Sequence, residues 1–174
     1  AQCLVGSEMC IRDSSSFVMS GETKIEGCQA ISNSSNSSKG GGVHLANNTK
    51  FTLSGNAVIQ NCTATNSANS GEAYGGGVNA ACVKEITLAD SARIVGCAAA
   101  NGSGLYITGS QVPGYGKLFA NGGSVDGDVV LGDKDKSDGP CTITGTGETV
   151  FKGKVTVTPG STIESGTFNG EVIN

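Results

Sequence analysis

The side chains that could support catalysis are few in this sequence. His44 is the only histidine among 174 residues, and a triad-type nucleophile needs a histidine held between itself and an acid. His44 lies between Val43 and Leu45, in a short run typical of a strand, which places its side chain on the outer face. We therefore expect no Ser-His-Asp or Cys-His arrangement.

Carboxylates are the other candidate catalytic groups, because glycoside hydrolysis needs two of them facing one groove, roughly 5–10 Å apart. Asp126 and Asp128 are two positions apart, so on a strand they share one face, and they are the best catalytic candidates. The other outward acids are scattered over residues 15–109 without forming such a pair. They are Glu22, Glu26, Glu72, Glu85 and Asp90. We expect no catalytic residues and a chain that is not an enzyme.

The seven cysteines matter through their spacing rather than their number. Cys28, Cys62 and Cys97 are 34 and 35 residues apart, and we expect them to stack in one column. A buried ladder of thiols acting as small apolar side chains is the first interpretation. A disulfide between neighbours is the second, although three stacked cysteines cannot all pair internally. A metal site would need a histidine or a fourth cysteine at ligand spacing. The redox state of the column stays open.

Residues 133–139, Asp-Lys-Asp-Lys-Ser-Asp-Gly, resemble a calcium-binding loop in their alternating acids. The glycine comes one position late, and the twelfth position is Thr144 rather than glutamate. We therefore interpret the segment as a charged turn, and we expect neither a metal nor a cofactor.

The element that must position all of these groups is a repeat of 34–35 residues between residues 15 and 109. Five columns keep this spacing. They are Phe17/Phe51/Ile86, Met19/Leu53/Leu88, Ile25/Ile59/Ile94, Cys28/Cys62/Cys97 and Ala30/Ala64/Ala99. Helical apolar spacing is absent, which excludes helical repeats of similar period.

Each repeat is typical of three short strands separated by tight corners. The first strand alternates apolar residues with Val or Thr, the second centres on an isoleucine, and the third follows a glycine-rich corner such as residues 40–42 or 75–77. Gly21, Gly55 and Asp90 end the first strand, where a corner needs a positive φ. Stacked repeats of this kind predict an all-β solenoid whose parallel strands lie about 4.8 Å apart.

The motifs Gly-Gly-Gly-Val-x-Leu, Phe-Thr-Leu-Ser-Gly and Ile-x-x-Cys-x-Ala resemble the repeat of right-handed parallel β-helix surface proteins, which are pectin-lyase-like in fold. Many members are adhesin-like or autotransporter-passenger proteins of bacteria. The resemblance covers residues 15–109 and departs from the family at residues 28, 62 and 97, where asparagine is common. It implies a right-handed parallel β-helix located outside the cell or on a bacterial surface. The family also contains polysaccharide lyases and glycoside hydrolases, so a fragment of a carbohydrate-active enzyme is the alternative.

After residue 109 the spacing shortens. Residues 125–129, 151–155 and 168–172 share an apolar-x-Gly-x-Val pattern, and the last two are 17 residues apart. This pattern predicts a continuation of the solenoid with shorter coils over residues 110–174. Solenoids need polar caps, and the final strand pattern has none, so we expect a longer parent protein.

Residues 3–14, Cys-Leu-Val-Gly-Ser-Glu-Met-Cys-Ile-Arg-Asp-Ser, resemble one reading frame of a transposase-type sequencing adapter. The resemblance implies that residues 1–14 are not native to the protein and that the sequence is a metagenomic fragment. Such segments are excluded from fold reasoning. The expected organisation is therefore a non-native segment at 1–14, regular coils at 15–109 and shorter coils at 110–174.

Two long polar loops interrupt the first two repeats at the same corner, over residues 31–39 and 65–74. They should protrude side by side, either as a partner-binding face or as a tolerated Ser/Asn spacer. The candidate contact residues are Asn33, Asn36, Lys39, Asn66, Asn69, Glu72 and Tyr74.

Two further columns lie on the outer faces. His44, Asn79 and Tyr106 share one column, which is either a sugar-contacting strip or a solvated face. In another column, Lys24 and Arg93 occupy the same strand position with Val58 between them.

Charge and hydropathy exclude several functions. A net charge of −4 gives no electrostatic case for nucleic acid or an anionic membrane. No apolar run approaches the roughly 18 residues that span a bilayer. The resemblance to β-helix surface proteins, together with the lack of a catalytic cluster, implies a non-catalytic adhesin or stalk segment whose partner would be a host surface protein or glycan. We also expect a monomer.

Overall fold

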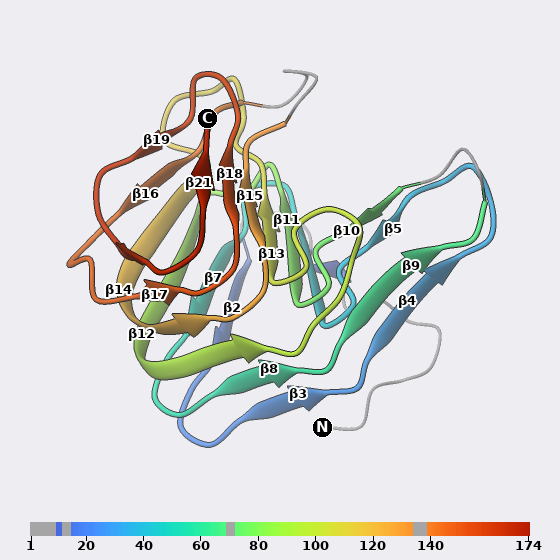
Figure 1. Cartoon of the computed structure of the whole chain (residues 1–174), viewed down its shortest axis with the longest axis horizontal. Coiled ribbons are helices and arrows are strands. Elements are labelled where there is room, and N and C mark those ends of the chain that lie inside the picture. The colour runs from blue at the N-terminus through green and yellow to red at the C-terminus, as the bar shows by residue number, and fades with distance from the viewer. Residues whose placement is uncertain (1–9, 12–14, 69–71, 134–138) are drawn as a thin grey trace.

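The computed structural model describes residues 10–11, 15–68, 72–133 and 139–174, with the side chains of residues 10 and 11 left aside. These residues form strands and no helix (Figure 1). Every pairing between the named strands is parallel. The protein is therefore all-β with parallel sheets, an architecture compatible with the predicted parallel β-helix.

Two large sheets and two small ones contain the strands. The seven-stranded sheet contains β1 (Cys10–Ile11), β6 (Val43–Ala46), β11 (Val78–Ala81), β13 (Leu105–Ile107), β15 (Val129–Leu131), β18 (Val155–Val157) and β21 (Val172–Ile173). The ten-stranded sheet contains β2 (Ser16–Met19), β7 (Lys50–Leu53), β12 (Glu85–Val95), β14 (Lys117–Val125), β16 (Thr142–Thr144), β19 (Thr162–Ile163), β3 (Lys24–Glu26), β8 (Val58–Gln60), β17 (Val150–Phe151) and β20 (Thr167–Phe168). The small sheets pair β4 (Gln29–Ser32) with β9 (Thr63–Asn66), and β5 (Ser38–Lys39) with β10 (Ala73–Tyr74).

Three apolar columns, two in the ten-stranded sheet and one in the seven-stranded sheet, supply most of the core, and Val172 at the end of the third column is exposed. They are Phe17/Phe51/Ile86/Leu118/Ile143/Ile163, Ile25/Ile59/Ile94/Val125/Phe151/Phe168 and Val43/Val78/Leu105/Val129/Val155/Val172. The predicted in-register stacking of the first three repeats is confirmed. The pairing of Phe151 with Phe168 also confirms the 17-residue spacing late in the chain.

Glycine is required at the corner before β11 because neighbouring backbone leaves no room for a side chain. A Cβ on Gly76 would lie 2.5 Å from the carbonyl carbon of Ala98 and 2.5 Å from the carbonyl oxygen of Ser103. After the first strand, Gly21, Gly55 and Asp90 all have a positive φ, at 63°, 66° and 58°. This confirms the predicted positive φ at all three positions.

One predicted strand boundary and the predicted number of strands per repeat were wrong. We expected the first strand of the third repeat to end at Ala89 and Asp90, but β12 continues through Asp90 as one 11-residue strand. The aspartate adopts its positive φ inside the strand, next to an irregularity in the pairing with β14. The first two repeats also contain more than the three predicted strands, because the long loops form the strands of the small sheets.

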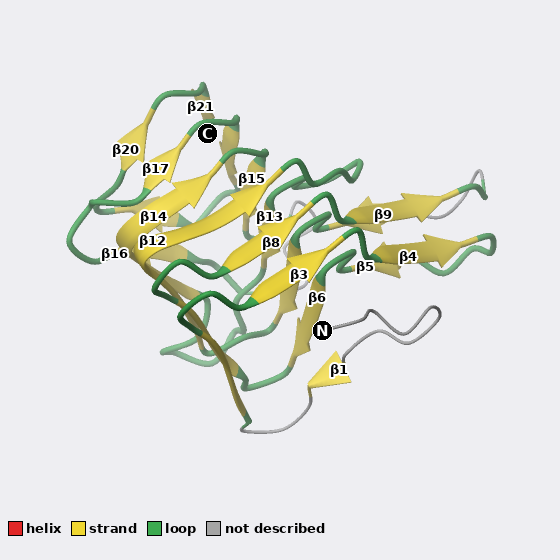
Figure 2. Ribbon diagram, turned by 90° about the horizontal axis from the view of Figure 1, so that it is seen from below, coloured by secondary structure: helices red, strands yellow, loops and turns green. Residues whose placement is uncertain are grey.

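The strands of the small sheets extend away from the rest of the molecule (Figure 2). We call the part made of β4, β5, β9 and β10 the lateral arm. The described residues include no helix with the length and apolar character needed to cross a bilayer.

Candidate functional site

The lateral arm places the two long loops beside each other, as the sequence predicted. Ala30 pairs with Ala64 between β4 and β9, and Tyr74 pairs with Lys39 between β10 and β5. Ala30, Ala64 and Ala73 form a small apolar cluster separate from the main core. Such a thin cluster buries little apolar surface, so the arm depends on its backbone pairing and polar contacts.

The predicted contact residues of the loops have different environments. Asn33, Asn36 and Lys39 are exposed. Asn66 is half-buried, and its amide donates to the carbonyl oxygens of Asn36 at 2.6 Å and Ser34 at 3.3 Å. Asn66 therefore holds the two loops together. Asn69 lies outside the described residues.

Tyr74 connects the lateral arm to the seven-stranded sheet. Its ring packs against that of Tyr106 on β13, with centroids 4.7 Å apart and a tilt of 56°. Its hydroxyl donates to the carboxylate of Glu72. Burial, followed by this hydrogen bond and the nearby carboxylate charge, raises the pKa of Tyr74 well above its ordinary value, so the phenol remains a neutral donor. The structure thus joins two groups of residues that the sequence treated as separate sites.

The solvated face predicted for His44 and Asn79 was wrong. Both side chains face away from the core columns, but they are only 8% and 2% exposed. His44 Nδ1 lies 2.8 Å from Asn79 Oδ1, which suits an Nδ1–H donating to the amide oxygen. The periodicity gave the direction of these side chains correctly, but alternation along a strand cannot show what packs over its outer side. Tyr106, in the same column, is half-buried beneath Tyr74.

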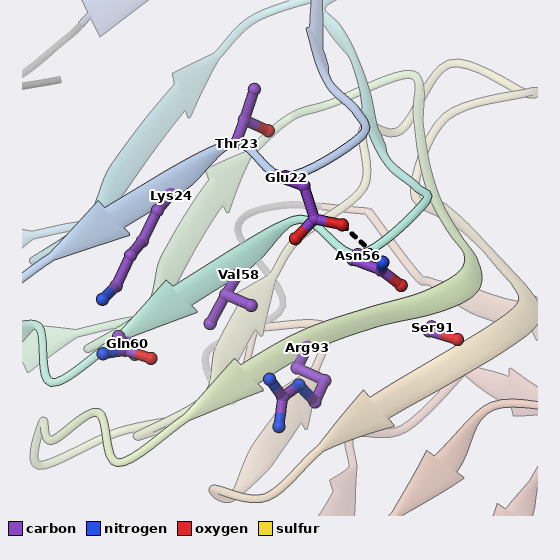
Figure 3. Close-up of a pocket in the computed structure, with 8 residues that line it drawn as sticks. All are labelled: Glu22, Thr23, Lys24, Asn56, Val58, Gln60, Ser91 and Arg93. Carbon is purple, nitrogen blue, oxygen red and sulfur yellow. Dashed lines mark hydrogen bonds between the residues drawn. The ribbon is translucent and has the colours of Figure 1, made fainter.

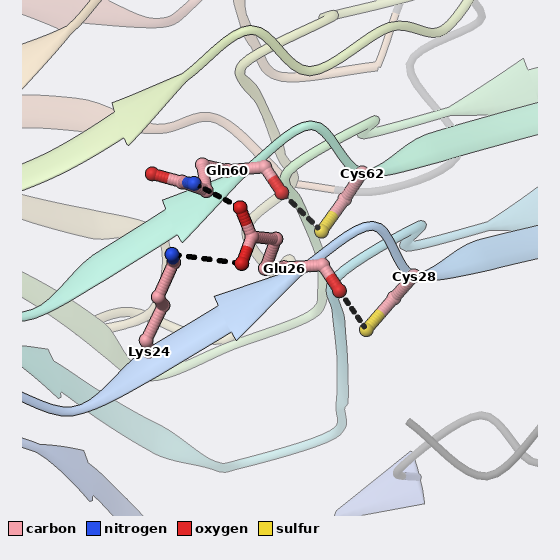
Figure 4. A network of polar contacts seen from close by, with 5 residues as sticks. All are labelled: Lys24, Glu26, Cys28, Gln60 and Cys62. Atoms are coloured by element: carbon pink, nitrogen blue, oxygen red, sulfur yellow. Dashed lines mark hydrogen bonds and ion pairs between the residues drawn. The ribbon is translucent and has the colours of Figure 1, made fainter. Parts of the chain in front are cut away.

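Cys28, Cys62 and Cys97 lie at successive repeats, and the backbones around them are paired through Cys28 O to Thr63 N and Cys62 O to Ala98 N, both 2.9 Å. Cys62 and Cys97 are buried free thiols, and the Cys62 thiol donates to the carbonyl of Gln60 at 3.2 Å (Figure 4). The hydrogen bond with Cys62, together with burial, raises the pKa of Cys97. The same hydrogen bond lowers the pKa of Cys62 to about 7, so Cys62 loses its proton before Cys97 does. Cys28 is disulfide-bonded.

A small polar network lies on β3 and β8, just before this column in the chain. Lys24 forms an ion pair with Glu26 at 2.7 Å, and the amide of Gln60 donates to the same carboxylate (Figure 4). The hydrogen bond from Lys24, then that from Gln60, lowers the pKa of Glu26. The network links β3 to β8 on the solvent side.

The acidic pair has structural partners in the described residues. The Asp126 carboxylate pairs with Lys152 at 3.0 Å and accepts a hydrogen bond from the Ser124 hydroxyl at 3.2 Å. The Asp128 carboxylate accepts the backbone N–H of Lys154 at 2.9 Å. Both acids therefore connect β14 and the turn that follows it to the next repeat.

Metal ligands do not converge in the described part of the chain: no three His, Cys, Asp or Glu side chains gather there as a metal site. The calcium-like segment includes residues 134–138, which lie outside the described residues. Comparison with protein-family models, curated proteins and solved structures gives no match to this chain.

Proposed function

We propose that this chain is a segment of a right-handed parallel β-helix that acts on a bacterial surface or outside the cell as an adhesin or stalk, without catalysis. Its ligand-contacting region is the arm surface, which we define as Tyr74 and Tyr106 together with the exposed Asn33, Asn36 and Lys39. The main support for this proposal is the packing of Tyr74 against Tyr106, which fixes two aromatic rings beside the polar loops.

The chemistry of the arm surface suits a glycan. Aromatic rings pack against the apolar faces of sugars while their hydroxyl groups stay hydrogen-bonded, and amide side chains donate to and accept from ligand hydroxyls. The exposed asparagines supply such groups at the loop tips. The tyrosine pair is held by the sheet on one side and by Glu72 on the other, so little ordering is required when a ligand binds.

The test is binding of the purified chain to a glycan array and to immobilised host surface proteins, for the wild type and Tyr106→Ala. We expect the wild type to bind a glycan. The affinity should fall at least about tenfold in Tyr106→Ala, because this substitution removes one well-placed aromatic contact. Phe119→Ala is the matched control, because Phe119 is also half-buried but lies on the ten-stranded sheet. Equal binding by the two variants would exclude the arm surface, and binding to proteins alone would replace the glycan as partner.

A catalytic role is tested on the same preparation. Pectins and host glycans are incubated with the chain, and released reducing or unsaturated sugars are measured. The partners of Asp126 and Asp128 support a structural role for both acids, so we expect no release. Release that disappears in Asp126→Ala or Asp128→Ala would overturn the non-catalytic proposal.

A further inference from the structure

A polar groove of about 490 Å³ lies on the ten-stranded sheet, away from the arm surface. Three successive repeats line it (Figure 3). Glu22, Asn56 and Ser91 form its corner side. The strand side is the column in which Val58 pairs with Lys24 on one side and with Arg93 on the other. Neighbouring strands are about 4.8 Å apart, so the two cations flank one valine.

Most charged groups of the groove already have partners. Asn56 Nδ2 donates to the Glu22 carboxylate at 2.6 Å, and Lys24 is paired with Glu26 at 2.7 Å. Arg93 is different: its guanidinium is exposed and makes no hydrogen bond or ion pair with any residue that the structure describes. Although the chain has a net charge of −4, this groove presents an uncompensated cation.

The backbone beside Arg93 is irregular, and Asp90 on the same strand has a partner elsewhere. The pairing of β12 with β14 is irregular between Asp90 and Arg93, where β12 has one more residue than β14. A bulge of this kind redirects the side chains beside it. Asp90 is turned so that its carboxylate accepts the backbone N–H of Gly55 at 2.8 Å. The neighbour of Arg93 in the next repeat is the uncharged Ser124.

We propose that this groove binds an oxyanion, a carboxylate or a sulfate carried on a sugar, with Arg93 as its charged contact. The guanidinium offers two parallel N–H donors to such a group. The exposed Ser91 hydroxyl provides a further donor on the same strand. The Val58 side chain, 8% exposed, forms an apolar floor for the ring that carries the anion. This site is on a different sheet from the arm surface and does not depend on it.

The experiment follows the Arg93 Nε–H resonance by NMR during titration of the folded chain at constant ionic strength. The probes are sodium sulfate, sodium glucuronate and the uncharged methyl ester of glucuronic acid. We expect a saturable shift with at least one anion and none with the ester. In Arg93→Gln, neighbouring backbone resonances should report an affinity at least about tenfold lower, because hydrogen bonds to charged groups contribute about 1.5–3 kcal/mol. Arg93→Lys should recover part of the lost affinity, since lysine keeps the positive charge but lacks the two parallel N–H donors of the guanidinium.

Lys117→Gln is the matched control, since Lys117 is exposed on β14 away from the groove lining. Saturation by sulfate alone assigns a sulfated ligand, and saturation by glucuronate alone assigns a carboxylated one. The proposal is overturned if the shifts are unsaturable, if the ester binds equally well, or if Arg93→Gln binds as the wild type does. Tyr106→Ala must retain the response, which separates this site from the arm surface.

Discussion

The N-terminal region, residues 15–109, and the C-terminal region, residues 110–174, share the same three core columns but differ in what connects them. Phe51 pairs with Ile86 across 35 residues, whereas Phe151 pairs with Phe168 across only 17. The extra length of the first two repeats forms the lateral arm. Parallel stacking therefore fixes the inward positions of each repeat and leaves the corners free to lengthen. Candidate ligand contacts accumulate where the chain is longest.

The two regions also differ in how well their columns are covered. Phe51 is 1% exposed between two neighbouring strands, while Phe168 is half-buried on the last strand of its column. Each phenylalanine stacks on one other ring, at 5.4 Å for Phe17–Phe51 and 5.1 Å for Phe151–Phe168. The residue type and aromatic contact are thus matched, and burial is the main difference.

Truncation of these two rings gives the largest expected effect. Phe51→Ala should lower the free energy of unfolding by about 3–5 kcal/mol, through lost burial and the cavity left behind. Phe168→Ala should cost about 1–2 kcal/mol, since much of its surface already meets water. Urea denaturation followed by circular dichroism measures both. Equal losses would show that the last repeat is as tightly packed as the second.

Glycine-to-alanine substitution tests whether every corner tolerates a side chain. Gly76→Ala should destabilise by about 3 kcal/mol, because overpacking against rigid backbone displaces the next repeat. Gly27→Ala is the control: apart from its chain neighbours, no atom of the described residues lies within 4 Å of its added Cβ, and its φ of 66° opposes alanine, a cost of about 1–2 kcal/mol. Thermal denaturation of both variants measures the difference. A smaller effect at Gly76 than at Gly27 would contradict the role of close approach at this corner.

The fold was more predictable from sequence than the candidate site. Repeating columns such as Ile25/Ile59/Ile94 were visible because the same burial environment selects the same residue at each turn. The strands of the lateral arm were missed because Ser, Asn and Thr between residues 31 and 39 are also typical of a loop. β12 was divided at Asp90 because a positive φ at a corner and one at a bulge require the same residue types.

The burial of His44 and the pairing of Tyr74 with Tyr106 depend on how the lateral arm lies against the sheet. That arrangement joins residues distant in sequence, and no periodic pattern reports it. The neutralisation of Lys24 by Glu26 was a different case. The two residues are two positions apart on one strand, so their shared face could be predicted from the sequence. The guanidinium of Arg93 has no hydrogen-bond or ion-pair partner among the described residues, and this could be recognised only from the structure.

The thiols of Cys62 and Cys97 should make the stability of the N-terminal region depend on pH. The pKa of Cys97 is raised above its ordinary value of 9.0 in the folded chain, so unfolding releases a proton above that pH. A raised folded pKa gives stability that is present below pH 9 and is lost as pH rises, by at most about 1.4 kcal/mol per pH unit for one proton. Cys97→Ala should remove this part of the slope between pH 9 and 10.5 in urea denaturation. Cys82→Ala, which removes a thiol outside the column that is not in a disulfide, should retain it. Identical slopes in all three proteins would contradict the coupling of Cys97 with Cys62.

The smallest expected effect separates the lateral arm from the body of the molecule. Asn66→Ala removes the donors to the carbonyl oxygens of Asn36 and Ser34, worth about 1 kcal/mol. Because the arm has only a thin alanine cluster, the change should raise amide hydrogen exchange over residues 31–39 and leave the exchange of β7 and β8 unchanged. Asn121→Ala is the matched control in the C-terminal region, where Asn121 Oδ1 accepts the N–H of Thr146 at 3.0 Å. Faster exchange throughout β7 and β8 in Asn66→Ala would mean that the arm and the core unfold together, and the longer corners would then contribute to the stability of the stack.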